Sequence, residues 1–416
     1  MKTYYDVVIC GGGTAGAMAG AAAARQGADT LIIEENACLG GMATSGMISM
    51  FMGFADGETQ PVKGLVGEMQ KKLAERGACS ESHTIYLAGR KEASVLSQTY
   101  DSEALKVVLD EIVLESGAQV LFHAKVIGLT LDNGKIISVQ VSCADEIITI
   151  GAGVFIDASF HGSLGHMAGI PLQSDYAASD FQPGSLMFKM ADIDTARYLG
   201  LTPAERRELA AEGIQAGQLY VDTIMSRPLG KTGVHFHNMS RVPLDPTDPE
   251  SWTAAEISGR AQVSRISRYL VEKVPGYEQA KLTAAGAHLG LRDSRRFRGI
   301  YTLTKDDVMR GTYFDDAVAA SSFPIDIHPK DTGFSFVKPA AGVFYVPYRS
   351  MVCHEVGNLI LAGRLISADV FAHAALRVMI TCMRIGESAG KAAALSLRQG
   401  VDPNAFPGEV LRGVEP

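Results

Sequence analysis

A run of glycines near the start of the chain has the spacing of a phosphate-binding turn. Gly11, Gly13 and Gly16 fit the pattern G-x-G-x-x-G, with Thr14 and Ala15 between the last two. The first glycine of such a pattern allows a tight turn, the second lets the backbone approach a pyrophosphate, and the third lets a helix pack closely on a sheet. The N-terminus of that helix offers unpaired N–H groups and a partial positive charge to phosphates.

A carboxylate stands 18 residues after the last of these glycines. Glu34 ends the next apolar run, where a carboxylate can accept hydrogen bonds from both hydroxyls of an adenosine ribose and repels the additional phosphate of NADP. Glu35 is the adjacent alternative for this contact. Together with the glycines, this carboxylate predicts a dinucleotide site. The alternative is an ordinary glycine-rich turn between a strand and a helix.

The elements that must position these residues form a strand–helix–strand unit. Residues 4–10 (YYDVVIC) and 29–33 (DTLII) are apolar without alternation, as expected of parallel strands buried on both faces. An alanine-rich helix over 14–26 separates them, and a strand at 358–362 followed by a helix over 369–399 repeats this order. We therefore expect an α/β fold, with a Rossmann-like, mostly parallel sheet and an inserted α+β substrate domain.

Several separated blocks of the chain resemble a known family. They are LGGMATSG at 39–46, DAS at 157–159, LRDSRRFRGIYTLTKDDV at 291–308, VPYRS at 346–350 and NLILAGRLISADVFAHAALRVMITCMRIGESAGKAAA at 358–394. With the glycine fingerprint and Glu34, their order and spacing resemble the FAD-dependent oxidoreductase family. This family is part of the glutathione-reductase-type flavoprotein superfamily and is related to fumarate-reductase flavoproteins.

The resemblance implies that the dinucleotide is FAD, with its AMP end at Gly11–Glu34. The loop at 41–46 then approaches the flavin, and the last helix points its N-terminus, near 372–374, at the flavin. No histidine that could anchor the flavin covalently is recognised near this loop, so a noncovalent FAD is expected. The further residues implied for the cofactor are Gly41, Met42 and Thr44 in the loop, Val126 beside the adenine, Asp157 in the DAS block, Gly363 and Arg364 at the pyrophosphate or ribityl chain, and His373 and Arg377 on the last helix.

One loop departs from the family. The family usually shows a TGDGD-like run here, whereas residues 159–163 read SFHGS, so two expected carboxylates are missing. This puts the usual substrate-side chemistry of the loop in doubt and makes His161 a candidate replacement acid or base. Residues 42–60 contain no cysteine pair, which excludes the disulfide-reductase branch.

Four other side chains are candidates for catalysis, each with a structural alternative. Arg292 and Arg296 alternate as on one strand face and could clamp a carboxylate or phosphate, or belong to an ion-paired edge strand. His373 could exchange a proton beside flavin N5, or bond to a backbone carbonyl. Tyr348 could line the cleft, or cap a domain junction.

The composition limits partners and location. The 416 residues contain 38 Lys and Arg against 46 Asp and Glu, a formal net charge of −8, so there is no basic surplus for a nucleic acid. No apolar run approaches the ~18 residues of a membrane span, and the N-terminus lacks a signal-peptide pattern, which favours the cytoplasm. The six scattered cysteines form no CxxC pair, and His235 and His237 lack an evident third ligand, so no metal site is expected.

These observations predict a two-domain FAD-dependent oxidoreductase. Its FAD-binding domain comprises 1–50, 95–165 and 345–416, the segment 51–94 covers the cleft, and the substrate domain is 166–344. A hydride would pass between flavin N5 and a small polar or anionic organic substrate, with an unknown electron acceptor or donor as partner. Two alternatives stay open: a flavin monooxygenase or oxidase, and a non-catalytic binding protein with the flavin fold.

Overall fold

The structure of the chain is a computed structural model that describes residues 1–54, 62–89, 93–175, 181–328, 335–337, 339 and 342–413. Parts of the predicted cleft-covering segment 51–94 and of the predicted substrate domain 166–344 therefore lie outside the described residues.

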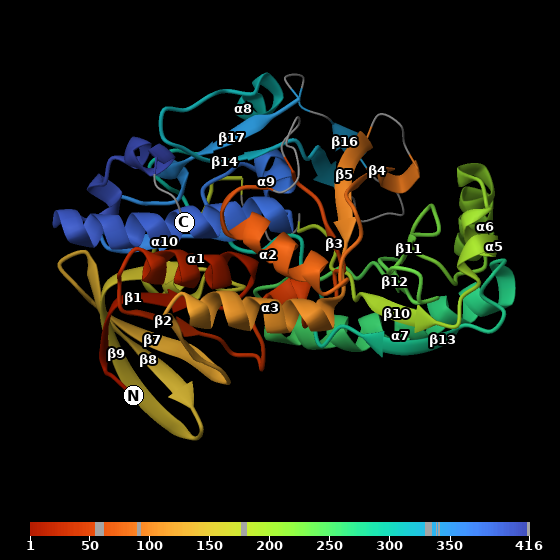
Figure 1. Ribbon diagram of the computed structural model, residues 1–416, viewed down its shortest axis with the longest axis horizontal. Coiled ribbons are helices and arrows are strands. Elements are labelled where there is room, and N and C mark those ends of the chain that lie inside the picture. The colour runs from red at the N-terminus through yellow and green to blue at the C-terminus, as the bar shows by residue number, and fades with distance from the viewer. Residues whose placement is uncertain are drawn as a thin grey trace.

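The largest sheet carries the glycine turn at the end of its first strand. Its strands in spatial order are β6 (Gln119–Leu121), β2 (Thr30–Ile33), β1 (Tyr4–Cys10), β9 (Glu146–Asp157), β8 (Lys135–Cys143) and β7 (Ala124–Asp132), and β18 (Leu359–Leu361) also pairs with β9. The pairs β6–β2, β2–β1, β1–β9 and β9–β18 are parallel, whereas β7, β8 and β9 form an antiparallel meander. This confirms the expected α/β fold with a mostly parallel sheet (Figure 1).

Two helices from opposite ends of the chain pack together against this sheet. α1 (Thr14–Arg25) follows the glycine turn, and α10 (Met379–Gln399) comes from the C-terminal block. A Cβ atom on Gly386 would lie 2.0 Å from the carbonyl oxygen of Ala15, and one on Gly390 would lie 2.1 Å from that of Ala19. Because only glycine permits such backbone contact, these two positions bring the two predicted cofactor blocks together.

The predicted helix over 369–399 is wrong in one respect, because it is two helices. α9 (Val370–Leu376) ends at Arg377, and α10 begins after Val378, whose backbone is extended (φ −71°, ψ 149°). At this break, Nη2 of Arg377 donates to the backbone carbonyl of Asp326 at 3.0 Å. A tertiary contact thus accompanies the interruption, and neither proline nor glycine marks it in the sequence.

Residues 47–100 lack a clean hydrophobic period, which predicts a loop-rich segment, but the structure shows regular elements there. A three-stranded antiparallel sheet is formed by β3 (Met50–Phe51), β5 (Ser94–Thr99) and β4 (His83–Tyr86). α2 (Gly64–Glu75) packs against both α10 and α3 (Ser102–Glu115). The apolar residues of α2 recur at helical spacing, and Leu65, Val66, Met69 and Leu73 are buried.

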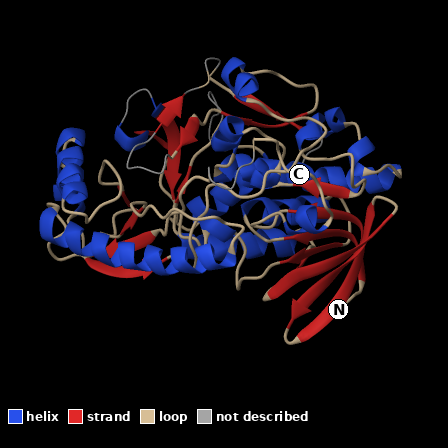
Figure 2. Ribbon diagram, turned by 180° about the vertical axis from the view of Figure 1, so that it is seen from behind, coloured by secondary structure: helices blue, strands red, loops and turns tan. Residues whose placement is uncertain are grey.

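A second, antiparallel sheet lies at the other end of the molecule. Its order is β11 (Ser226–Pro228), β12 (His235–His237), β10 (Phe188–Ala191) and β13 (Lys281–Ala285), and the long helix α7 (Pro249–Lys273) runs along it (Figure 2). Thr253-Ala254-Ala255-Glu256 has the spacing of a capping box and predicts a helix start, but this prediction is wrong, because α7 starts at an Asp248 cap and includes these residues. The remaining elements are α4 (Ser163–Met167), α5 (Thr195–Leu199), α6 (Pro203–Gln215), α8 (Lys305–Arg310), β14 (Ala317–Ser321), β15 (Ile325–Ile327), β16 (Ser335–Val337) and β17 (Phe344–Pro347).

The buried apolar side chains form separate clusters around the two sheets. The larger cluster joins the parallel sheet, α1 and α10, and it also includes Phe297, Leu303 and Ile325. A second cluster runs from Leu186 to Leu291 between the antiparallel sheet and α7. The division at 166 and 344 stays a prediction, and these contacts associate 297–325 with the FAD-binding side.

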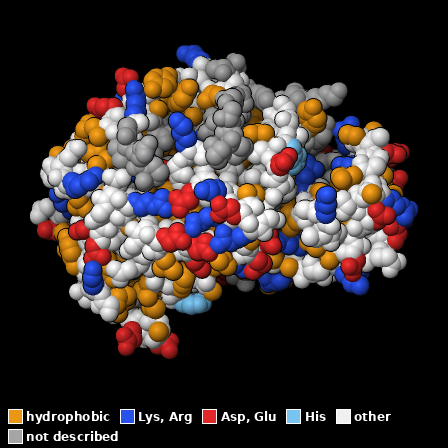
Figure 3. Space-filling model, viewed as in Figure 1, with side chains coloured by type: hydrophobic (Ala, Val, Ile, Leu, Met, Phe, Trp, Pro, Cys, Tyr) orange, Lys and Arg blue, Asp and Glu red, His pale blue; other side chains and the backbone are white. Residues whose placement is uncertain are grey.

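On the face shown in Figure 3, basic and acidic side chains are interspersed over α2 and α3. Lys72 pairs with Glu111 and Glu115, and Arg76 pairs with Glu111. Each basic group here has an acidic neighbour, so this face offers no continuous basic surface to a polyanion.

Candidate active site

One cavity of about 1240 Å³ extends from the glycine turn towards the antiparallel sheet. Its walls come from the C-terminal ends of β1 and β2, the 41–48 loop, the strands β3 and β4, the second sheet, and the start of α10. The carboxyl ends of parallel strands are where open α/β sheets bind their ligands. The position of the cavity therefore agrees with a dinucleotide site at one end.

The glycine turn forms a cradle of bare backbone in this cavity. Gly11 has a φ of +96°, and a Cβ there would lie 2.7 Å from the carbonyl oxygen of Ala158, while a Cβ on Gly16 would lie 1.8 Å from that of Gly11. Gly13 differs, because an added Cβ would meet nothing within 4 Å. Gly11, Gly13, Thr14 and Ala15 line the cavity, and Gly16 lies behind them under the turn. Space for a pyrophosphate thus lies at the N-terminus of α1.

Glu34 is held rigidly beside this cradle. Its Oε2 accepts a hydrogen bond from the backbone N–H of Gly12 at 2.6 Å, and its Oε1 accepts one from that of Asn36 at 2.8 Å. The side chain is buried and lines the cavity, and carboxylate oxygens have further lone pairs for a ribose. Glu35 also lines the cavity, but its carboxylate lies 3.4 Å from Lys125 and is half exposed. The geometry thus favours Glu34 for the ribose contact.

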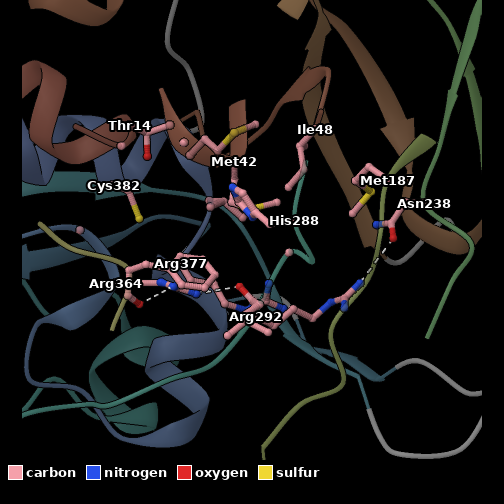
Figure 4. Close-up of a pocket in the computed structure, with 18 of the residues that line it drawn as sticks. Thr14, Met42, Ile48, Met187, Asn238, His288, Arg292, Arg364, Arg377 and Cys382 are labelled. Carbon is pink, nitrogen blue, oxygen red and sulfur yellow. Dashed lines mark hydrogen bonds between the residues drawn. The ribbon is translucent and has the colours of Figure 1, made fainter. Parts of the chain in front are cut away.

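Most of the further residues implied for the cofactor also line the cavity. These are Gly41, Met42, Val126, Gly363, Arg364 and Arg377. Val378 and Met379 join them, so the N-terminus that faces the cavity belongs to α10 and lies a few residues beyond the predicted 372–374. Figure 4 shows Arg364, Arg377 and Arg292 across the cavity from Thr14 and Met42.

Three of the implied residues lie behind the wall instead, namely Thr44, Asp157 and His373. The Thr44 hydroxyl donates to the backbone carbonyl of Leu39, which ties the loop to itself. Asp157 is fully buried, and it accepts hydrogen bonds from the N–H groups of Ser159 and Gly165. Thr44 and Asp157 therefore shape the turns that reach the cavity without lining it.

The structure brings two of the five catalytic candidates to the cavity, His161 and Arg292. The His161 ring packs 4.4 Å from Trp252, and burial lowers its pKa to about 3, so the imidazole is neutral. Arg292 donates from Nη1 to the carbonyl of Pro183 at 2.6 Å. Burial, and then the charge of Arg377, lower the pKa of Arg292 to about 9.

The other three candidates, His373, Arg296 and Tyr348, are buried away from the cavity lining. The His373 ring bonds through Nε2 to the carbonyl of Arg364 at 3.1 Å. Arg296 forms an ion pair with Asp175 at 2.9 Å, and the Tyr348 hydroxyl donates to a backbone carbonyl at 2.9 Å. Residues 292–296 are also irregular and not a strand, so Arg292 and Arg296 do not share one strand face. The contact of His373 matches its structural alternative, and Arg296 is ion-paired as its alternative expected but does not lie on an edge strand.

A cluster missed in the sequence lies next to Arg292. Asp326 and His328 come from β15 and the residue after it, and both line the cavity. The Asp326 carboxylate lies 3.1 Å from Nε2 of His328 and 3.4 Å from Nη2 of Arg377. Burial and the charge of Arg292 lower the pKa of His328 to about 3, although Asp326 opposes this. The only trace in the sequence is the alternation of Asp and His, which by itself indicates no chemistry.

The comparisons with known proteins agree with this geometry. A model of the family described as FAD dependent oxidoreductase matches residues 6–414. Digeranylgeranylglycerophospholipid reductases of Thermoplasma acidophilum and Thermoplasma volcanium are both 26% identical over 211 and 206 residues. These matches cover 49% and 48% of this chain, and 52% and 51% of the relatives, so the chain spans about half the length of the curated relatives it matches.

Two solved structures share the fold over nearly the whole chain. A geranylgeranyl bacteriochlorophyll reductase-like protein from Thermoplasma acidophilum superimposes with a TM-score of 0.52 at 15% identity, covering 98% of this chain and 81% of its own. The p-nitrophenol 4-monooxygenase PnpA from Pseudomonas putida DLL-E4 gives a TM-score of 0.52 at 12% identity, covering 96% and 82%. At these identities the likeness concerns the fold alone.

Two further findings concern the described part of the chain. None of its helices has the length and apolar character needed to cross a membrane. Within the same residues, no three His, Cys, Asp or Glu side chains are grouped as metal ligands.

Proposed function

The chain belongs to the FAD-dependent oxidoreductase family, and from that premise we propose that it moves a hydride between flavin N5 and a carbon atom of a small polar or anionic organic substrate. FAD supplies the two-electron chemistry when bound, and a separate electron acceptor or donor completes the cycle. One observation carries the proposal: a single cavity joins the phosphate-binding turn to a cluster of ionisable side chains.

The residues present fit a noncovalent FAD. The open space above Gly13 and the N-terminus of α1 suit a pyrophosphate, and the fixed Glu34 carboxylate suits a ribose. The residues that we assign to FAD are Gly11, Gly13, Thr14 and Ala15 at the phosphates, Glu34 at the ribose, Val126 at the adenine, Gly363 and Arg364 along the chain, and Gly41, Met42 and the N-terminus of α10 at the flavin.

The substrate end favours an anion. Arg292 and Arg377 bring two positive charges to the wall, and Asp326 brings one negative charge, which leaves a surplus of positive charge. Arg292 reaches across the cavity towards Asn238, 3.5 Å away, so its guanidinium is near the path of a substrate (Figure 4). A guanidinium can bind a carboxylate through two parallel hydrogen bonds.

We assign the proton that accompanies the hydride to the His328–Asp326 pair. The neutral imidazole of His328 can accept a proton from a substrate hydroxyl, and the imidazolium would then lie beside the Asp326 carboxylate. In the direction of reduction, the same pair would return the proton. His161 is the second candidate at the cavity, on the side of Trp252.

The test has two arms with the purified protein: anaerobic bleaching of the oxidised flavin absorbance with a panel of sugars and hydroxycarboxylates, and anaerobic return of the absorbance of dithionite-reduced flavin with enoates. We expect a hydroxycarboxylate to bleach the flavin, and Arg292→Gln to slow bleaching at least tenfold without loss of FAD. Arg298→Gln is the matched control, because Arg298 is 60% exposed and lies outside the cavity lining. Protein that stays colourless after incubation with FAD would refute the proposal. Rapid peroxide release, or oxygen built into the product, would favour the oxidase or monooxygenase instead.

A further inference from the structure

Beyond Arg292, the cavity continues as a passage with apolar walls. We define the apolar passage by its lining residues Met50, Met52, Ile85, Leu87, Met225, Phe236 and Phe323. Met50, Ile85, Phe236 and Phe323 belong to one buried cluster, and Val378 at the start of α10 packs against that cluster. The apolar passage therefore begins at the flavin end and runs to the second sheet.

Two arginines line the far part of the same cavity. Arg227 is the direct partner of Phe236 in the β11–β12 pair, so the two side chains stand on the same face of the sheet. Arg206 comes from α6, and its guanidinium lies 4.6 Å from the centre of the Tyr198 ring. Both arginines line the cavity together with Leu199, Pro203 and Met225.

Neither arginine has an acidic partner among the described residues. The Nε atoms of both are buried and lack a hydrogen-bond acceptor, whereas Arg25 and Arg349 are paired with Glu68 and Asp316. Arg227 donates only from Nη1 to the carbonyl of its neighbour Ser226, at 3.3 Å. Burial and then the positive charge of Arg206 disfavour the charged form of Arg227 and lower its pKa. Arg206 donates from Nη2 to the carbonyl of Tyr198 at 3.4 Å. Both side chains are half-buried, so two cations without an acidic partner among the described residues face the same cavity.

We propose that Arg206 and Arg227 bind the anionic end of an amphiphilic substrate whose apolar segment fills the passage and whose reacting carbon lies at the flavin end. This deepens the proposed function, on which it rests, and narrows the substrate to a carboxylate or phosphate monoester with an apolar chain. The apolar walls should bind longer apolar chains more tightly, and the two guanidiniums should bind a terminal negative charge through charge-assisted hydrogen bonds.

The experiment is calorimetric titration of the FAD-loaded full chain with hexanoate, octanoate, decanoate, decyl phosphate and decanol. We expect decanoate or decyl phosphate to bind at least tenfold more tightly than decanol. From hexanoate to decanoate, binding should tighten about fourfold per methylene. The carboxylate and phosphate arms show which headgroup is preferred.

The variants Arg206→Met and Arg227→Met should each weaken binding of the preferred anion at least tenfold and leave binding of decanol within twofold. Arg227→Lys should restore part of the affinity, and Arg207→Met, an exposed neighbour on α6, should change nothing. Because Arg227 is half-buried and has no acidic partner among the described residues, Arg227→Met should not lower the midpoint of thermal unfolding. If Arg227 had only a structural role, Arg227→Met would instead lower the midpoint of thermal unfolding.

The proposal of an amphiphilic substrate would be overturned if decanoate and decanol bind equally, or if the variants bind decanoate as the parent does. Either result would leave the proposed function standing. The flavin absorbance of the same samples reports on the proposed function separately. Protein that holds no flavin would overturn both the proposed function and the assignment of the amphiphile as its substrate.

Discussion

The two ends of the cavity are built in different ways. At the dinucleotide end, backbone atoms from one short turn form the cradle, and Gly11, Gly13 and Gly16 are there because side chains would fill it or clash. At the substrate end, side chains from several distant segments meet, such as Arg292, Asp326 and Arg377. A site made of local backbone leaves a pattern in the sequence, whereas a site assembled from distant side chains leaves none.

The largest expected effect is a loss of FAD binding at the cradle with no loss of folding stability. Gly13→Asp should abolish FAD binding, with at least a thousandfold loss of affinity, because the new carboxylate projects into the space for the pyrophosphate. The apoprotein should unfold at the same temperature as the parent, since an added Cβ meets no atom within 4 Å. Flavin titration measures the affinity for FAD, and thermal unfolding measures the stability of the apoprotein. Gly16→Val should instead destabilise the apoprotein, because its Cβ would strike Gly11.

A smaller loss is expected at the ribose. Glu34→Gln should weaken FAD binding about tenfold to a hundredfold, since hydrogen bonds to a charged group contribute about 1.5–3 kcal/mol. Equilibrium dialysis with FAD measures the change. Glu35→Gln is the matched control, and an equal loss there would show that the fixed geometry of Glu34 does not select the ribose contact.

Acid should lower the stability of the fold through four histidines that lie outside the cradle. His161, His235, His237 and His328 have folded-state pKa values lowered by burial, to between about 3 and about 4. Their neutral forms stabilise the fold above the unfolded pKa of about 6.5, and this contribution is lost as the pH falls below it. Urea unfolding should therefore show lower stability at pH 5 than at pH 7, and no such change between pH 7 and pH 9.

The smallest expected effect isolates one of these histidines. His161→Phe should reduce the difference in unfolding free energy between pH 7 and pH 5 by about 2 kcal/mol, because a histidine that stays neutral in the folded chain contributes about 1.4 kcal/mol per pH unit below its unfolded pKa. The phenyl ring can keep the contact with Trp252. An unchanged pH dependence would show that His161 titrates alike in the folded and unfolded chain.

The same contrast explains what could be predicted from the sequence. β1 was predicted with the bounds observed, and α1 and β2 within a residue or so, because local hydrophobic pattern and glycine placement determine them. The break between α9 and α10 could not be predicted, since no helix-breaking residue marks Val378.

The candidate residues divide in the same way. Arg296 and His373 carry the side chains that catalysis uses, but distant partners such as Asp175 and the carbonyl of Arg364 occupy them. Asp326 lies on a short strand and His328 follows it, and no motif marks them, so only the tertiary structure shows their position beside Arg292. The residue type shows which chemistry a side chain can perform, and the fold determines whether that side chain reaches the cavity.

The glycine contacts between α1 and α10 have a consequence for biosynthesis. Gly386 and Gly390 seat the C-terminal helix directly on the backbone of the helix that begins at the phosphate turn. A growing polypeptide therefore lacks one wall of its flavin pocket until α10 has left the ribosome. Cofactor capture is then a late, post-translational event, and a nascent chain stalled before Met379 should emerge without yellow colour.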